Sequence, residues 1–286
     1  MCDKFEKLVS VRSMMTKGLD LLLYEAQVKM LNLYKTANAG HIGASLSCLQ
    51  ILIFIVQKLM LQKADKLILS KGHAAGALYT VLDQAGKLSG HDLSQFYKNG
   101  TQLAAHPPCS GLIESIPFGT GSLGHGLGLA VGLALSARFT GSKNKIFVVL
   151  SDGELNEGST WEAIMFASQL KIANLYVFVD KNGLQGIGKT TDVINLTNLS
   201  EKFSMFGWDV SASQNGNNFA DLAFALAELK DEEKPKVVIC NTIKGCGISY
   251  MENKVEWHYL PMNEIQYDQA LKEVKETYEK TIFDLA

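Results

Sequence analysis

The sequence predicts an α/β fold in which an open, mostly parallel β-sheet carries helices on both faces. Residues 146–150 and 175–179 are short, continuous apolar runs, the pattern of strands that are buried on both faces. Helical patterns lie between such runs, and strands that alternate with helices are typical of a parallel sheet. We interpret residues 1–286 as a single domain because no repeat, linker or low-complexity segment divides the chain.

The individual elements follow from the spacing of apolar residues. A helical N-terminal segment, residues 1–38, ends in the helix stop Asn38-Ala39-Gly40. The further predicted helices are residues 46–60, 73–84, 156–170, 219–229 and a polar C-terminal helix, 264–284. The predicted strands are residues 66–70, 146–150, 175–179, 208–210 and 237–240. Ligands of open parallel sheets bind beyond the carboxyl ends of the strands, so candidate functional residues are sought there.

Composition argues against several classes of protein. The chain is 47% hydrophobic and 20% charged, with a net charge of -2 and scattered basic residues, so a nucleic-acid partner is not expected. Its five cysteines lack metal-ligand spacing and indicate reduced thiols in a cytoplasmic protein. The N-terminus has no signal-peptide pattern. Two apolar stretches, 51–60 and 127–137, are shorter than the roughly 20 residues that span a membrane, so both are predicted to be buried helices and no membrane association is expected.

Two consecutive strand ends each present an oxygen-bearing side chain. One strand continues into Ser-Asp-Gly-Glu at 151–154, and the next ends in Asp-Lys-Asn-Gly-Leu at 180–184. The Asp152 carboxylate and the Asn182 amide suit Mg²⁺ or Ca²⁺ that completes its shell with phosphate, a backbone carbonyl and water. Gly153 allows close approach of a phosphate, and the N-terminus of the following helix adds positive partial charge. Either motif alone also fits a simple turn, but the pair favours a metal and phosphate site.

This pair of motifs resembles the thiamine diphosphate motif of the transketolase family, which runs from Gly-Asp-Gly to Asn-Asn. Ser151 replaces the first glycine and Lys181 the first asparagine, and neither change removes an expected ligand. The resemblance extends over about residues 10–265. Further segments that match in order and spacing are residues 37–45, 69–73, 105–107, 119–126, 242–247 and 256–258.

The resemblance implies roles for the residues in these segments. The implied cofactor-binding residues are His73, Gly121, Ser122, Leu123, Asp152, Gly153, Glu154, Asn182, Lys244 and His258. The implied catalytic residues, which face the substrate, are His41, His106 and His258. The implied ligands of Mg²⁺ or Ca²⁺ are Asp152, Asn182 and the backbone carbonyl of Leu184. Glu157 and Glu162 match family glutamates at a subunit interface, and for Glu162 a plain position on the helix surface is an alternative of nearly equal weight. For Lys244 a solvated surface lysine is an equal alternative.

The resemblance also implies a partner. The family's pyrimidine-binding domain, whose glutamate helps to activate thiamine diphosphate, normally follows the segment around residue 260. We therefore expect this chain to be the N-terminal subunit of a split enzyme, inactive alone, which joins a C-terminal pyrimidine-binding subunit in a heterotetramer. The expected reaction transfers a two-carbon ketol unit between phosphorylated sugars.

Three alternatives remain open. The α subunit of a 2-oxo acid dehydrogenase shares the fold and the Asp–Asn motif, although the histidines argue against it. A related transferase of an unusual-sugar or specialised pathway would also carry these motifs. A non-catalytic half-enzyme is the third alternative, and it is suggested by Ser151 and by Tyr259, which stands where many relatives have glycine.

Overall fold

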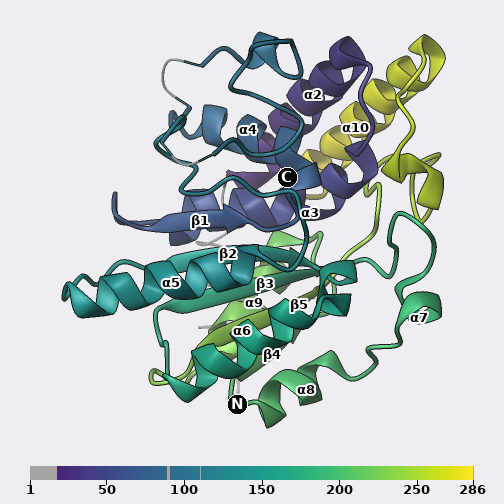
Figure 1. The fold of residues 1–286 in the computed structure, drawn as a ribbon. Helices are drawn as coiled ribbons and strands as arrows, with labels where there is room; N and C mark the ends of the chain where they lie inside the picture. The colour runs from purple at the N-terminus through teal and green to yellow at the C-terminus, as the bar shows by residue number, and fades with distance from the viewer. Residues whose placement is uncertain (1–17, 89–90, 110, 286) are drawn as a thin grey trace.

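The computed structural model describes residues 18–88, 91–109 and 111–285 (Figure 1). In these ranges the strands form one five-stranded sheet in the order β1-β2-β3-β5-β4, and all neighbours are parallel. The strands are β1 (Lys66–Leu69), β2 (Ile146–Ser151), β3 (Leu175–Lys181), β4 (Asp209–Ser213) and β5 (Lys236–Asn241). The predicted parallel sheet is confirmed, and each predicted strand overlaps an observed one.

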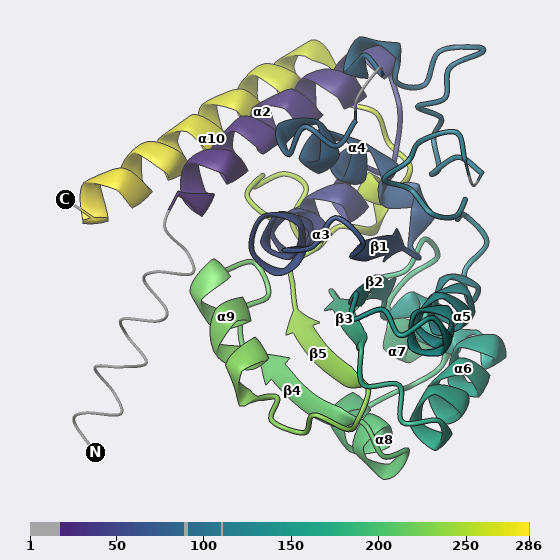
Figure 2. The same cartoon turned by 90° about the vertical axis from the view of Figure 1, so that its left-hand side faces the viewer.

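Helices cover both faces of the sheet (Figures 1 and 2). One face carries α2 (Leu19–Ala37), α3 (Ile42–Phe54), α4 (Ala75–Gln84), α9 (Phe219–Glu228) and α10 (Glu264–Leu285). The other carries α5 (Gly126–Phe139), α6 (Gly158–Gln169) and α8 (Leu199–Met205), while the short α7 (Thr190–Val193) lies in the connection after β3. Alternate residues of a strand face opposite sides, so Phe147 and Val149 belong to the first core and Val148 and Leu150 to the second.

The predicted helix 46–60 is longer in the structure. It begins at Ile42 and continues beyond Phe54 as a π-helical turn, Ile55–Leu59. Gly43 permits this early start, because a Cβ there would lie 2.9 Å from the Trp257 carbonyl oxygen. The run Ile42–Leu59 is long and apolar enough to cross a membrane, so the expectation of a short stretch was wrong. However, 89% of this run is buried inside the protein, as the prediction of a buried helix requires.

Two strand ends turn through a 3₁₀ segment before their helices begin. The segment Gly153–Asn156 precedes α6, and Gly72–Ala74 precedes α4. The predicted helices 156–170 and 73–84 therefore each start two residues too early. The α-helical N-terminus expected at residue 156 is displaced to Gly158, and the tight turn itself faces the candidate site.

The remaining helix predictions differ mainly in burial and extent. Of the N-terminal segment 1–38, residues 1–17 lie outside the described residues, and the rest forms α2, which stops at a left-handed Asn38 as predicted. The helices predicted at 219–229 and 264–284 are confirmed as α9 and α10. The stretch 127–137 lies in α5, which is buried on one side only, since Gly128 and Gly132 are exposed.

Candidate cofactor and substrate site

A cavity of about 350 Å³ lies beyond the carboxyl ends of β1, β2, β3 and β5. Its walls come from segments far apart in the sequence, because parallel strands bring their following loops to the same edge. Of the predicted site residues, the cavity is lined by His73, Gly121, Leu123, Gly153, Asn182, Leu184, Lys244 and His258. The structure thus brings eight of the predicted residues around one cavity.

The other predicted residues lie next to this wall or beneath it. Asp152 is buried directly under the strand-end turn. His41 stands beside His73 and His258 of the wall, and His106 stands beside His41. A Cβ on Gly121 would lie 3.3 Å from the His106 ring. Ser122 is exposed in the loop before α5. Glu154 is fully buried and does not line the cavity.

Hydrogen bonds join the two oxygen-bearing strand ends. Asp152 accepts from the backbone N–H of Gly153 at 2.9 Å and from that of Gly183 at 2.6 Å. The Asn182 Oδ1 accepts from the backbone N–H of Leu184 at 3.0 Å. Burial and the nearby charge of Asp180 raise the pKa of the Asp152 carboxyl to about 6. Such a carboxylate would gain from a neighbouring cation.

The donor set here is oxygen-rich but small. In the part of the chain that the structure describes, no cluster of three or more His, Cys, Asp or Glu side chains could hold a metal ion. Any cation at Asp152 and Asn182 must therefore take further oxygens from backbone carbonyls, water or a bound anion. Magnesium behaves in this way, since it is commonly held by one or two carboxylates together with phosphate oxygens and water.

Glu154 connects three segments below the cavity. Its Oε1 accepts hydrogen bonds from the Ser70 hydroxyl, at the end of β1, and from the Gly124 backbone N–H at 2.9 Å. The backbone N–H of Glu154 donates to the Ser151 hydroxyl at 3.2 Å. Glu154 therefore holds the loop before α5 in place, and the Ser151 hydroxyl closes the turn.

Four histidines gather above the strand ends. The His41 ring centroid lies 5.5 Å from that of His73, 5.3 Å from that of His258 and 6.1 Å from that of His106. Burial, with repulsion from His106 and Lys244, lowers the pKa of His41 to about 4. Burial also lowers the pKa of His73 well below its usual value and, helped by repulsion from Lys244, that of His258 to about 3. These rings are therefore neutral near pH 7.

The backbone at His41 is strained. This residue has φ of 73°, in the left-handed region that few non-glycine residues occupy, and it precedes α3. Its backbone N–H donates to the His258 carbonyl at 3.0 Å, which joins two segments more than 200 residues apart in the sequence. Strain of this kind gathers at functional sites, where the surrounding structure compensates it.

Two lysines are buried in the site. Lys71 forms a fully buried ion pair with Asp180, which also accepts hydrogen bonds from the Ser47 and Thr242 hydroxyls. Lys244 is 1% exposed, and its Nζ lies 3.0 Å from His258 Nδ1. Burial and repulsion from Lys71 lower the pKa of Lys244 to about 8. The alternative of a solvated Lys244 is therefore wrong.

The Lys71–Asp180 pair escaped the sequence analysis. Its residues lie inside matched or apolar segments, one just after β1 and the other in the apolar run of β3. The available signal was the position of Asp180, a charged residue at the end of a run of five apolar residues that is buried on both sides. A charge in such a place is nearly always paired.

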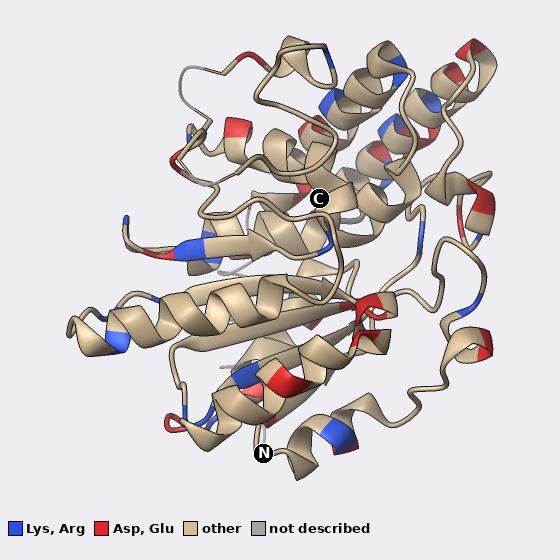
Figure 3. Ribbon diagram, in the orientation of Figure 1, with Lys and Arg blue, Asp and Glu red and all other residues tan. Residues whose placement is uncertain are grey.

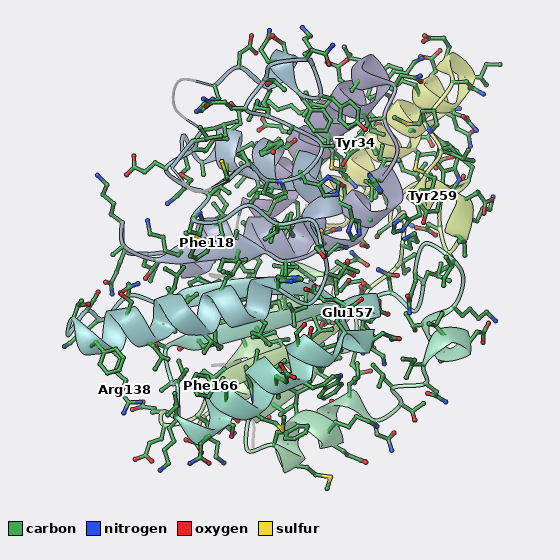
Figure 4. The ribbon with its side chains drawn as sticks, viewed as in Figure 1. Tyr34, Phe118, Arg138, Glu157, Phe166 and Tyr259 are labelled. Carbon is green, nitrogen blue, oxygen red and sulfur yellow. The ribbon has the colours of Figure 1, made fainter. Side chains whose placement is uncertain are left out.

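Tyr259 lies between the histidines and the loop after β3. Its ring centroid is 4.7 Å from that of His258 and 6.3 Å from that of His41. A Cβ on Gly186 would lie 2.1 Å from the Tyr259 hydroxyl, so the phenol packs directly over that backbone. The Tyr259 side chain, labelled in Figure 4, is 58% exposed and lines the cavity together with His258.

Comparison with known proteins gives this geometry a family. Residues 25–282 match the family model described as "Transketolase, thiamine diphosphate binding domain". The chain belongs to the transketolase family. Within it, one subunit of the apulose-4-phosphate transketolase of Phocaeicola vulgatus is 34% identical over 276 residues, which cover 93% of this chain and 97% of that protein. A 6-deoxy-6-sulfo-D-fructose transketolase subunit of Clostridium is 35% identical over 245 residues, covering 82% of this chain and 88% of its own length.

Single-chain transketolases are matched over part of their length. The human enzyme is 32% identical over 247 residues, which cover 83% of this chain and 39% of that protein. The solved transketolase of Campylobacter jejuni superposes with a TM-score of 0.78 at 25% identity, over 92% of this chain and 43% of that one. The expected membership in the transketolase family, and the likeness to one of the two subunits of split enzymes, are confirmed. They argue against the 2-oxo acid dehydrogenase alternative.

Proposed function

We propose that this chain is the diphosphate-binding subunit of a two-chain transketolase that moves a two-carbon ketol unit between phosphorylated sugars. The observation that carries the proposal is Lys244. It is buried, it faces a cavity, and no carboxylate forms an ion pair with it in the described residues. Burying an uncompensated charge is costly, so the site is suited to an anionic ligand.

Thiamine diphosphate fits this site through its anionic end. Lys244, His73 and the backbone of Gly121, Ser122 and Leu123 would hold the diphosphate, with Gly153 leaving room for it. Mg²⁺ or Ca²⁺ would join the diphosphate to Asp152, Asn182 and the Leu184 carbonyl, and the diphosphate would supply the further oxygens that the protein lacks there. When bound, the cofactor supplies the carbon nucleophile for ketol transfer.

The histidines would handle the sugar. Neutral imidazoles donate and accept hydrogen bonds without the desolvation cost of a charge, which suits the recognition of hydroxyl groups. His41 and His106 would contact substrate hydroxyls. His258 would donate to the substrate carbonyl oxygen, which gains negative charge when that carbonyl is attacked.

We infer a partner subunit from the likeness to subunits of split transketolases and from an apolar surface. This chain spans 39% of the human transketolase, whereas it spans nearly all of the matched apulose-4-phosphate transketolase subunit. Arg138 is the one charged residue on α5, and Figure 3 shows the rest of that helix in tan. On the neighbouring α6, Met165 is 47% and Phe166 is 52% exposed, with Glu157 at the end of this helix nearer the site (Figure 4). These features support burial of α5 and α6, including Glu162, against a pyrimidine-binding subunit. We propose that the assembled enzyme is a cytoplasmic heterotetramer.

A specialised substrate is a second candidate. Relatives of this chain act on apulose 4-phosphate and on 6-deoxy-6-sulfo-D-fructose, according to their names. Tyr259 favours such a substrate because it places an exposed phenol ring beside the histidines. Both candidates share the ketol transfer and differ in the sugar.

The test is reconstitution. The chain would be purified alone and together with a candidate pyrimidine-domain protein from the same organism, and ketol transfer would be measured with a panel of ketose phosphates and sulfonated ketoses. Turnover is expected for the pair, dependent on thiamine diphosphate and Mg²⁺, and not for the chain alone. Robust turnover by the isolated chain, or none by the loaded pair with any ketose, would overturn the proposal.

A further inference from the structure

The contact between Lys244 and His258 has a defined direction. A lysine ammonium has three N–H donors and no acceptor. In its 3.0 Å contact, Nζ of Lys244 must therefore donate and Nδ1 of His258 must accept. A nitrogen that accepts carries no proton, and a neutral imidazole has a single N–H. The proton of the His258 ring must then reside on Nε2.

The surroundings favour a neutral ring and a charged lysine. His258 lies 5.1 Å from His73 and 5.3 Å from His41, centroid to centroid, and no carboxylate is hydrogen-bonded to it in the described ranges. Burial and the Lys244 charge lower the pKa of His258 to about 3, while the pKa of Lys244 is about 8. Near pH 7, therefore, the pair carries one positive charge, on the lysine.

Backbone hydrogen bonds hold the two segments that carry these side chains. The His258 carbonyl accepts from the His41 backbone N–H, and the Lys244 carbonyl accepts from the Asn253 backbone N–H at 3.0 Å. On the other side of the ring, a Cβ on Gly186 would lie 3.4 Å from His258 Cδ2, the atom bonded to Nε2. The ring thus stands between Lys244 and the loop that lines the cavity.

A lysine partner has the opposite effect from a carboxylate. In a Ser-His-Asp arrangement the carboxylate accepts from Nδ1–H, which leaves Nε2 without a proton and ready to act as a base. A lysine on Nδ1 leaves Nε2 with the proton, so the ring faces the cavity as a donor. The same side chain serves as a base in one setting and as a donor in the other.

We propose that Lys244 is a positioning residue that keeps His258 in the Nε2–H tautomer, so that His258 acts in ketol transfer as a hydrogen-bond donor and not as a general base. The catalytic half of this statement rests on the proposed function. The tautomer half concerns this chain alone.

The test reads the tautomer directly. The full chain would be labelled with ¹⁵N-histidine, and long-range ¹H–¹⁵N correlation spectra would be recorded at pH 7, with His258 assigned by the signals lost in His258→Gln. We expect a bare Nδ1 and a protonated Nε2. Lys244→Arg, which also only donates, should keep this tautomer, whereas Lys244→Met should give a mixture.

Two results would overturn the inference. One is a proton on Nδ1 in the wild-type chain, which decides the question even if Lys244→Met does not fold. The other is an unchanged tautomer in a folded Lys244→Met chain. In the reconstituted pair, saturated with thiamine diphosphate, Lys244→Met should lower kcat more than it changes the KM of the donor ketose. A pair without any ketol transfer would refute the proposed function and leave the tautomer result standing.

Discussion

Lys71 and Lys244 are both buried at the same edge of the sheet, yet their surroundings differ. Lys71 has its counter-charge within the chain, because it forms an ion pair with Asp180, whose carboxylate also accepts hydrogen bonds from two hydroxyls. Lys244 has only a neutral histidine as a hydrogen-bond partner in the described residues. The charge of Lys71 is neutralised inside the folded chain, whereas the charge of Lys244 is available to an anionic ligand. Lys71 therefore stabilises the site, and Lys244 is suited to bind a ligand in it.

The largest expected effect is a loss of folding stability when the Lys71 charge is removed. Lys71→Met leaves a buried Asp180 carboxylate unpaired and should destabilise the fold by about 3–5 kcal/mol. Lys244→Met removes a charge that burial disfavours and should change stability far less. Urea unfolding of the two variants measures the difference. A similar loss in both would show that the two lysines do not differ in role, and the double variant Lys71→Met/Asp180→Leu should recover part of the stability.

The next effect concerns the partner of Lys244. His258→Ala in the reconstituted enzyme should lower kcat by about 10²–10³, the usual contribution of one donor to developing charge. Thiamine diphosphate affinity should stay within a few-fold, because the histidine donates to the substrate. Steady-state kinetics and calorimetry check the two halves, with His91→Ala as a control outside the cavity. Loss of thermal stability alone, with kcat retained, would make His258 a packing residue.

A third prediction tests the oxygen ligands. Asp152→Ala should weaken metal-dependent binding of thiamine diphosphate by more than about 100-fold, since even outer partners of metal ligands are worth about 10–100-fold. The fold should persist, because the Asp152 side chain accepts only two backbone hydrogen bonds. Calorimetry with and without Mg²⁺ measures the loss, and Asp192→Ala on exposed α7 is the control. Equal affinity in Asp152→Ala and wild type would contradict the metal site.

The smallest expected effect is a pH dependence of thiamine diphosphate affinity that arises from Lys244. Burial and Lys71 lower the pKa of Lys244 to about 8, while Asp180 and Asp152 oppose this shift and His258 faces the ammonium. The protonated lysine binds an anion, so the affinity for thiamine diphosphate should fall a few-fold as pH rises through about 8. Bound diphosphate stabilises the ammonium and raises its pKa, so the affinity starts to fall at about pH 8 and continues to fall up to the pKa of Lys244 in the complex. Lys244→Arg keeps its charge, and an equal fall in that variant would assign the pH dependence elsewhere.

The same pKa shift affects stability in the opposite direction. Between about pH 8 and the ordinary lysine pKa of 10.5, Lys244 binds fewer protons in the folded chain than in the unfolded one. By linkage, the contribution of Lys244 to the free energy of unfolding rises with pH across that window. Above about pH 8, therefore, Lys244 should lower the affinity for thiamine diphosphate while its contribution to the free energy of unfolding increases.

The sequence predicted the fold well because buried parallel strands leave an unambiguous pattern. The apolar runs that became β2 and β3 contain hardly a polar residue before their ends, and the ends themselves carried the site motif. Boundaries were less predictable. The start of α3 at Ile42 depends on contact with Trp257, and the 3₁₀ turn after Asp152 depends on a hydrogen bond to Ser151. Such contacts form only in the folded chain.

The site residues could be predicted where a local motif indicates the role of a side chain. Asp152 and Asn182 were identified because their oxygens at two strand ends imply metal ligands, whereas the histidines were identified because their segments match the transketolase family. Glu154 was assigned to the cofactor by its position in the motif, but its carboxylate turns downward to Ser70 and Gly124. The Lys71–Asp180 pair was missed because partners more than 100 residues apart share no local pattern.

The buried carboxylate of Glu154 has a consequence for the order of events at the site. Its hydrogen bonds fasten the end of β1 and the loop before α5 to the turn after β2 without any ligand. The amide of Gly124 should therefore resist hydrogen exchange in the cofactor-free chain, as members of one cooperative unit do. A diphosphate arriving at such a site meets a preformed receptor, and little of its binding energy is consumed in arranging the loops.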